Sequence, residues 1–231
     1  MVSLVTSPRI RFEVDRAGLR ISMIVLEDLR TGKSDREFEA YEADLFDEIR
    51  SLMTLDEVKS DPIFRSYRDL YWTFGMDPTK LRVSSEALLR RVLRGENLWR
   101  ISNLVDVANL ASAYHKIPIG LIDDSKRVGD LVVRTARRGE VFTRIGGKTL
   151  ECRGREIVLA DEEKIVCFGY ATHDSEMTKV SKESERVLVL LYGSPAVTGS
   201  VLSDAYDRTA YMIDSWVDCR MSKPITFTSS D

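Results

Sequence analysis

SSEALLRRVLRGENLWRISNLVDVANLASAYHKIPIGLID, residues 84–123, contains two helical segments joined by a short polar linker. The first has serines at its start, Glu86 in its first turn, apolar residues three and four apart, and Gly95 as a stop signal. Serine caps, an early acid and a terminal glycine are typical of a complete short helix. The second segment, 103–115, is apolar on nearly every side, which predicts a buried helix.

The predicted buried helix carries one row of polar side chains. Asn103, Asp106 and Asn109 recur at every third position and therefore share one face. A buried amide or carboxylate without a partner costs about 1–3 kcal/mol. The row must therefore face either a structural hydrogen-bond network or a cleft, and the sequence leaves both open.

Outward from this stretch, helical periodicity gives way to strand periodicity. Further helices are expected over 37–58, 61–75 and 200–219, and a strand pair joined as a hairpin over 9–14 and 20–27. From residue 131 the apolar residues alternate with period two, and short turns such as Ile145-Gly146-Gly147-Lys148 separate the strands. The pattern predicts the α+β class: a mostly antiparallel sheet with helices packed on it.

The chain has 231 residues, of which 43% are hydrophobic. We expect a main domain over 61–220, a strand pair and helix over 1–60 that are appended to it or integral, and a polar tail over 221–231. No run of about 18 apolar residues occurs, so no membrane association is expected. Three separated cysteines predict reduced thiols and a cytoplasmic location.

Most catalytic signatures are absent. The sequence contains no G-x-S-x-G, G-x-x-x-x-G-K-[ST], G-x-G-x-x-G or H-E-x-x-H motif. With only two histidines, a histidine-rich metal site is excluded, and we expect neither a metal nor a cofactor.

Basic residues concentrate in two segments of a chain whose net charge is -3. Residues 65–100 hold eight Lys or Arg against four Asp or Glu, and residues 126–155 hold nine against three. Arginine makes bidentate bonds to phosphate and stacks on bases. The segments therefore favour a localised anionic partner, although solvated faces paired with acids elsewhere would give the same pattern.

A longer string, residues 64–140, resembles the editing domain of the phenylalanyl-tRNA synthetase beta chain, the paired B-three/B-four modules, in a stand-alone form. The specific elements are SSEALLRRVL-G, LVDVANL and P-I-G-L-I-D-x5-G. The resemblance extends over about residues 62–192 and includes no aminoacylation motif. A complete synthetase is therefore not implied.

The resemblance implies a β-sandwich-like core with helices around a pocket. In that family the pocket hydrolyses tyrosine wrongly attached to the phenylalanine tRNA, a second sieve for a binding site that discriminates too weakly. An aminoacyl ester is already activated, so a pocket that positions and polarises water can suffice without a nucleophile. The implied partner is tRNA or aminoacyl-tRNA, with a small amino-acid-like ligand as the alternative.

The family's functional positions fall on five residues of this sequence. The resemblance implies that Asn109 orients the ester or water, that Asp106 lies beside it, and that Glu176 reads the amino acid. Gly169 matches the glycine before the turn of the pocket strand. The family has a histidine where this chain has Gly120.

Two further features follow from these departures. His173 is a candidate replacement for the missing histidine, and Tyr170, Ala171 and Thr172 stand where the family has a glycine-rich turn. Contacts to the tRNA backbone are expected from six arginines: Arg90, Arg91, Arg94, Arg134, Arg137 and Arg138.

Three functions therefore remain open from sequence. The chain is a hydrolase that deacylates mischarged tRNA in trans, a binding module that holds tRNA or an amino acid without turnover, or a domain reused for an unrelated small molecule.

Overall fold

The longest strand, β2 (Arg20–Arg30), lies inside a sheet and is buried along most of its length. In the computed structural model, which describes residues 7–229, this sheet has the order β11-β2-β10-β3, and β12 also pairs with β2. The other strands are β3 (Ile119–Asp123), β10 (Val187–Gly193), β11 (Asp218–Met221) and β12 (Ile225–Thr228). All pairings in this sheet are antiparallel.

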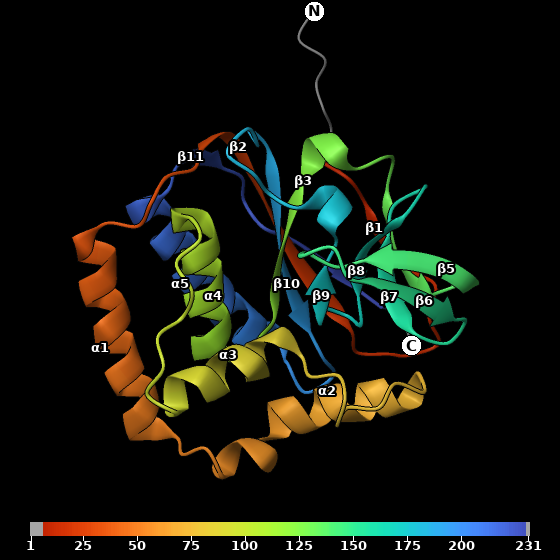
Figure 1. Ribbon diagram of the computed structural model, residues 1–231, viewed down its shortest axis with the longest axis horizontal. Helices are drawn as coiled ribbons and strands as arrows, with labels where there is room; N and C mark the ends of the chain where they lie inside the picture. Colours follow the sequence, from red (N-terminus) through yellow and green to blue (C-terminus); the bar gives the residue numbers. More distant parts are fainter. Residues whose placement is uncertain (1–6, 230–231) are drawn as a thin grey trace, which may run out of the picture.

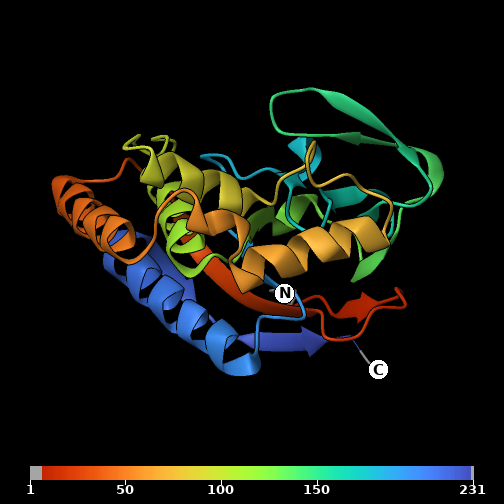
Figure 2. The ribbon, with the colours of Figure 1, turned by 90° about the horizontal axis from the view of Figure 1, so that it is seen from below.

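A second five-stranded sheet has the order β1-β4-β7-β8-β9. Its strands are β1 (Ile10–Phe12), β4 (Leu131–Thr135), β7 (Ile157–Ala160), β8 (Ile165–Phe168) and β9 (His173–Asp174), and only β1 with β4 is parallel. Between β4 and β7 the chain forms a separate hairpin, β5 (Arg138–Thr143) with β6 (Thr149–Arg153). Figure 2 shows this hairpin standing out from the body of the molecule.

The helices pack around the first sheet (Figure 1). They are α1 (Arg36–Leu52), α2 (Pro62–Thr73), α3 (Ser84–Leu93), α4 (Asn103–His115) and α5 (Gly199–Trp216), and short 3-10 turns lie at Glu57–Lys59, Asp124–Lys126 and Glu176–Thr178. The α+β class predicted from sequence is confirmed, with mostly antiparallel strands. None of the helices in residues 7–229 is both long and apolar enough to cross a membrane.

Three expectations about the ends of the chain are wrong in detail. The predicted hairpin between the first two strands does not form, because both edges of β2 are occupied by β10, β11 and β12. The first helix ends at Leu52, not 58, because the Thr54 N–H and hydroxyl bond to the Glu57 carboxylate and close a turn. The last helix ends at Trp216, and β11 follows it.

The predicted N-terminal unit and tail share the hydrophobic core of the main domain. Ile21 and Phe38 belong to the same buried cluster as Leu110 and Leu190. In the tail, β12 pairs with β2 from Ile225 to Thr228. Residues 1–6 and 230–231 of these two segments lie outside the described residues.

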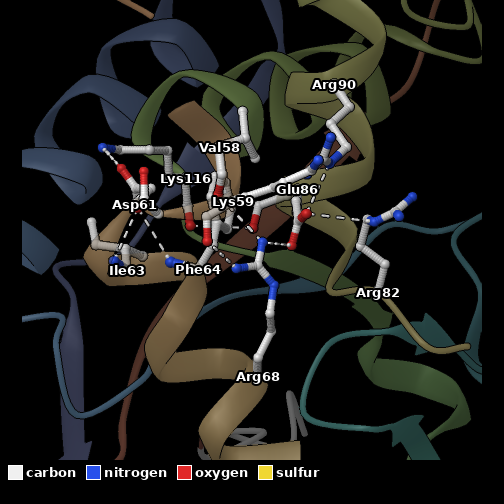
Figure 3. Close-up of polar contacts among 12 residues, drawn as sticks. Val58, Lys59, Asp61, Ile63, Phe64, Arg68, Arg82, Glu86, Arg90 and Lys116 are labelled. Atoms are coloured by element: carbon white, nitrogen blue, oxygen red, sulfur yellow. Dashed lines mark hydrogen bonds and ion pairs between the residues drawn. The ribbon is translucent and has the colours of Figure 1, made fainter. Parts of the chain in front are cut away.

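A buried carboxylate joins α2 to α3. The Glu86 side chain is 4% exposed and pairs with Arg90 at 2.8 Å, Arg68 of α2 at 2.9 Å and Arg82 at 3.6 Å (Figure 3). Arg68 also donates to the Lys59 carbonyl at 2.8 Å. Because three guanidinium groups converge on this one buried carboxylate, Glu86 neutralises positive charges that would otherwise repel one another.

Replacing Glu86 should therefore destabilise the fold strongly. Glu86→Gln leaves the buried end of the arginine cluster uncompensated, and breaking a buried ion pair from one side typically costs about 3–5 kcal/mol. The matched control is Asp47→Asn, whose exposed pair with Arg50 is expected to contribute less than about 1 kcal/mol. Urea denaturation measures both, and equal losses in the two variants would contradict the assignment.

Candidate functional site

A pocket of about 380 Å³ opens between α3, α4, β3 and the tip of the β5–β6 hairpin. Seven apolar and six polar residues share its wall. It is lined by Ser84, Leu88, Trp99, Ile101, Val105, Asn109, Ile119, Arg144, Ile145, Ala171, Thr172, His173 and Asp174. A second hollow shares Asn109, Ile119 and Asp174 with it and continues along β3 toward Lys179 and Val180.

The polar residues of α4 have both roles that the sequence left open: some form a structural hydrogen-bond network and one faces a cleft. Asn103 accepts from the Gly32 N–H and donates to the Trp216 carbonyl, both at 2.9 Å. Asp106 is 2% exposed and accepts from the Ile101 N–H at 2.9 Å and the Ser34 hydroxyl at 2.7 Å. Asn109 lines the pocket. Asp106 thus secures the linker before α4, and Asn109 faces the cavity.

Asp174, on the short strand β9, lines the same pocket as Asn109. The Leu121 N–H of β3 donates to its carboxylate at 3.3 Å. This close approach requires the glycine of β3: a Cβ at Gly120 would lie 3.0 Å from Asp174 Oδ1 and 3.0 Å from the Tyr192 ring. The space beside position 120 is therefore occupied by the Asp174 carboxyl group and by the ring of Tyr192, which lies on the neighbouring strand β10.

Burial of Asp174 makes its charged form less favourable than that of an exposed aspartate. Burial raises the pKa of Asp174 to about 6, although hydrogen bonds from Leu121 and Cys167 favour the charged form. Among the described residues no charged side chain lowers the pKa of Asp174, and the buried hydroxyl of Tyr192 lacks a hydrogen-bond partner of ordinary geometry. Burial also raises the pKa of Tyr192 and of Cys167. Asp174 therefore exchanges its proton near neutral pH.

The loop before β9 has a strained backbone. Gly169, Tyr170 and Ala171 adopt φ values of 72°, 49° and 74° in succession. Non-glycine residues rarely adopt this left-handed region, and such strain concentrates at functional sites. Gly169 does not line the pocket; a Cβ there would lie 2.5 Å from the Thr172 hydroxyl. Gly169 therefore permits the turn that brings Ala171 and Thr172 to the pocket wall.

His173 lines the pocket next to Asp174. Burial lowers the pKa of His173, and the nearby positive charge of Arg144 lowers it further. The imidazole is therefore neutral at pH 7 and can donate or accept a hydrogen bond in the cavity.

The tip of the β5–β6 hairpin is fastened to the pocket rim. The Ile145 N–H donates to the Asp174 carbonyl at 3.1 Å, and the Gly146 N–H donates to the Glu176 carboxylate at 3.0 Å. Glu176 also pairs with Lys179, and this hydrogen bond lowers the pKa of Glu176. Glu176 does not line the pocket but holds the hairpin tip that carries Ile145 and Arg144 into its wall.

The arginines proposed for nucleic acid fall into two groups. Arg90, expected from the sequence to contact the tRNA backbone, is buried and pairs with the buried Glu86 carboxylate. Arg134 forms a bidentate pair with Glu140 at 2.6 and 2.9 Å and is half-buried. Arg91 is held by Glu96 and stacks over Trp99. The exposed members are Arg94, Arg137 and Arg138.

Among the pocket residues that the sequence did not identify as site residues are Asp174, Arg144 and Trp99. Asp174 adjoins the predicted His173, but only the pairing of β9 with β8 shows which acid of the HDSE loop faces inward. Arg144 and Trp99 come from a hairpin tip and an irregular linker, where no periodicity indicates a face. Among the described residues no group of three or more His, Cys, Asp or Glu side chains could hold a metal ion.

Comparison with known proteins defines the family. The model of the B3/4 domain matches residues 66–215, so the chain belongs to the B3/4 domain family.

Curated relatives are beta subunits of phenylalanine–tRNA ligase. The one from Fusobacterium nucleatum is 26% identical over 110 residues, and the one from Chromobacterium violaceum is 34% identical over 83. These matches span 48% and 36% of this chain but only 14% and 11% of the relatives. A solved N-terminal fragment of the phenylalanyl-tRNA synthetase beta subunit from Pyrococcus horikoshii matches 94% of this chain and 53% of its own, with a TM-score of 0.47 and 13% identity.

A single methyl group at position 120 should disturb this arrangement. Gly120→Ala places a Cβ within 3.0 Å of two buried groups, and overpacking of this kind costs about 1–3 kcal/mol. Gly199→Ala is the control, since a Cβ there meets nothing within 4 Å, and we expect a change below about 1 kcal/mol. Thermal unfolding of both variants checks this, and an unchanged Gly120→Ala would refute the close packing.

Proposed function

We propose that this chain binds the aminoacyl end of tRNA and hydrolyses the ester of a mischarged amino acid in trans. The observation that carries the proposal is that one pocket is lined both by the Asn109 amide and by a carboxyl group whose pKa is about 6. Membership of the B3/4 domain family and similarity to parts of phenylalanine–tRNA ligase beta subunits support a tRNA ligand. We place this activity in the cytoplasm.

In the proposed reaction Asp174 acts as the general base. Its carboxylate takes a proton from water, the water oxygen attacks the ester carbonyl carbon, and the bond to the ribose oxygen then breaks. The protonated Asp174 returns its proton to that oxygen, so that free amino acid and uncharged tRNA leave. A base with a pKa near 6 is largely ionised at pH 7 yet basic enough to assist.

The other polar groups of the pocket have supporting roles in this proposal. The Asn109 amide donates to the carbonyl oxygen as negative charge develops on it, and neutral His173 orients the water or ester. Arg144 supplies a cation for the phosphate beside the terminal ribose. Glu176 acts as a positioning residue through the hairpin tip, and Asp106 through the linker before α4.

The β5–β6 hairpin supplies a path for the RNA backbone. Arg138 and Arg153 face each other in the register of the hairpin, and both are exposed, as are Arg137 and Arg155. Like charges directly opposite each other on two strands are destabilising unless an anion lies between them. Because the hairpin tip lines the pocket, a backbone that follows these arginines leads to the site.

The catalytic proposal is tested by single-turnover deacylation of a panel of correctly and wrongly charged tRNAs, including tyrosine on the phenylalanine tRNA. We expect hydrolysis of one mischarged species, with a rate that rises about tenfold per pH unit below pH 6 and levels off above it, as Asp174 ionises. Asp174→Asn should lower the rate by about 10²–10⁴ and Asn109→Ala by about 10²–10³.

Asp204→Asn, an exposed acid of α5, is the control and should retain the wild-type rate. Hydrolysis that persists in Asp174→Asn with an unchanged pH profile would remove Asp174 from the mechanism. No hydrolysis of any charged tRNA, together with tRNA binding, would favour the non-catalytic binding module.

The RNA path predicts a separate effect on affinity. Arg138→Ala/Arg153→Ala should weaken tRNA binding and reduce the slope of log affinity against log salt by about 2, since two phosphate contacts are lost. Arg36→Ala, an exposed arginine of α1 at the opposite end of the molecule (Figure 1), should leave both unchanged. Filter binding over a salt series measures this, and identical slopes for all three proteins would exclude the hairpin as the path.

A further inference from the structure

An exposed tryptophan stands at the mouth of the pocket. Trp99 is 55% exposed and lines the cavity from the linker between α3 and α4. The Arg91 guanidinium lies over the indole ring, 4.4 Å from its centroid. A large aromatic surface left in water at a cavity mouth loses the burial energy that tryptophan normally provides.

The position of the ring is fixed although its surface is exposed. Arg91 donates from Nε to the Asn97 carbonyl at 2.5 Å and pairs with Glu96 at 2.6 Å, so the cation under the ring is anchored at two points. Two residues further along, the Ile101 N–H is held by the Asp106 carboxylate. The linker therefore presents a rigid, cation-backed aromatic plane to the pocket.

The other exposed tryptophan provides a contrast. Trp72 of α2 is 59% exposed, so it is as accessible as Trp99. Trp72 does not line the pocket, and no arginine of the described chain stacks on it. The two tryptophans are therefore equally exposed, but only Trp99 lines the pocket and has an anchored arginine stacked on its ring.

We propose that Trp99 is the stacking platform for the nucleobase of the nucleoside whose ribose carries the ester. A planar base between the indole and solvent would cover the exposed apolar face, and aromatic stacking accepts any base because every base has a π-face. Arg91 behind the ring fixes the plane. The choice of a nucleotide ligand rests on the proposed function.

The test uses small probes, so that stacking is measured apart from hydrolysis. Adenosine monophosphate and ribose 5-phosphate are titrated by calorimetry into the wild type, Trp99→Ala, Trp99→Phe and Trp72→Ala. We expect adenosine monophosphate to bind the wild type more tightly than ribose 5-phosphate. Trp99→Ala should weaken the adenosine monophosphate affinity at least fivefold and leave that of ribose 5-phosphate unchanged. Trp99→Phe should recover part of the loss, and Trp72→Ala should behave as the wild type.

The proposal is overturned if Trp99→Ala binds adenosine monophosphate as the wild type does, if both probes weaken equally, or if the wild type shows no preference for the base. These outcomes are distinguishable from failure of the proposed function. Asn109-dependent deacylation with a fully active Trp99→Ala would refute stacking and leave the hydrolase intact. Trp99-dependent nucleotide binding without any deacylation would support stacking and refute the hydrolase.

Discussion

The candidate site depends on the absence of a side chain at position 120. Strand β3 passes directly behind the pocket, and only a glycine there lets the Asp174 carboxyl group and the Tyr192 ring approach its backbone. The same approach buries the carboxyl group among Leu121, Cys167 and Tyr192, which raises its pKa to about 6. The glycine at position 120 is therefore coupled to the presence of a titratable group in the pocket wall.

Buried charge serves two different purposes in this chain. Glu86 is surrounded by three arginines and fastens α2 to α3, and Asp123 is satisfied by Ser125, Ser184 and Lys126, which keep its pKa low against the effect of burial. Among the described carboxyl groups with a shifted pKa, Asp174 alone shifts upward. A buried acid whose charged form no ion pair stabilises costs stability, and such costs concentrate at sites of chemistry.

The sequence predicted the local elements better than their partners. Helix α4 has the predicted bounds, because the Ser102 cap and the apolar run are local signals. The predicted pairing of β1 with β2 was wrong, because strand pairing depends on which strand edges other strands leave open. In the site, periodicity identified the polar row but not that Asn103 and Asp106 would be satisfied internally. Counting charges along the sequence likewise could not show that Arg90 is paired with the buried Glu86 whereas Arg138 is exposed.

The most direct test is the ionisation of Asp174 itself. A carbon-13 NMR titration of the side-chain carboxyl signals, with the Asp174 signal assigned by its loss in Asp174→Asn, measures this pKa without any assumption about substrate. The account predicts a midpoint near pH 6. A midpoint near the ordinary value of 3.8 would mean that the carboxylate is solvated or paired, and would contradict its role as the base of this pocket.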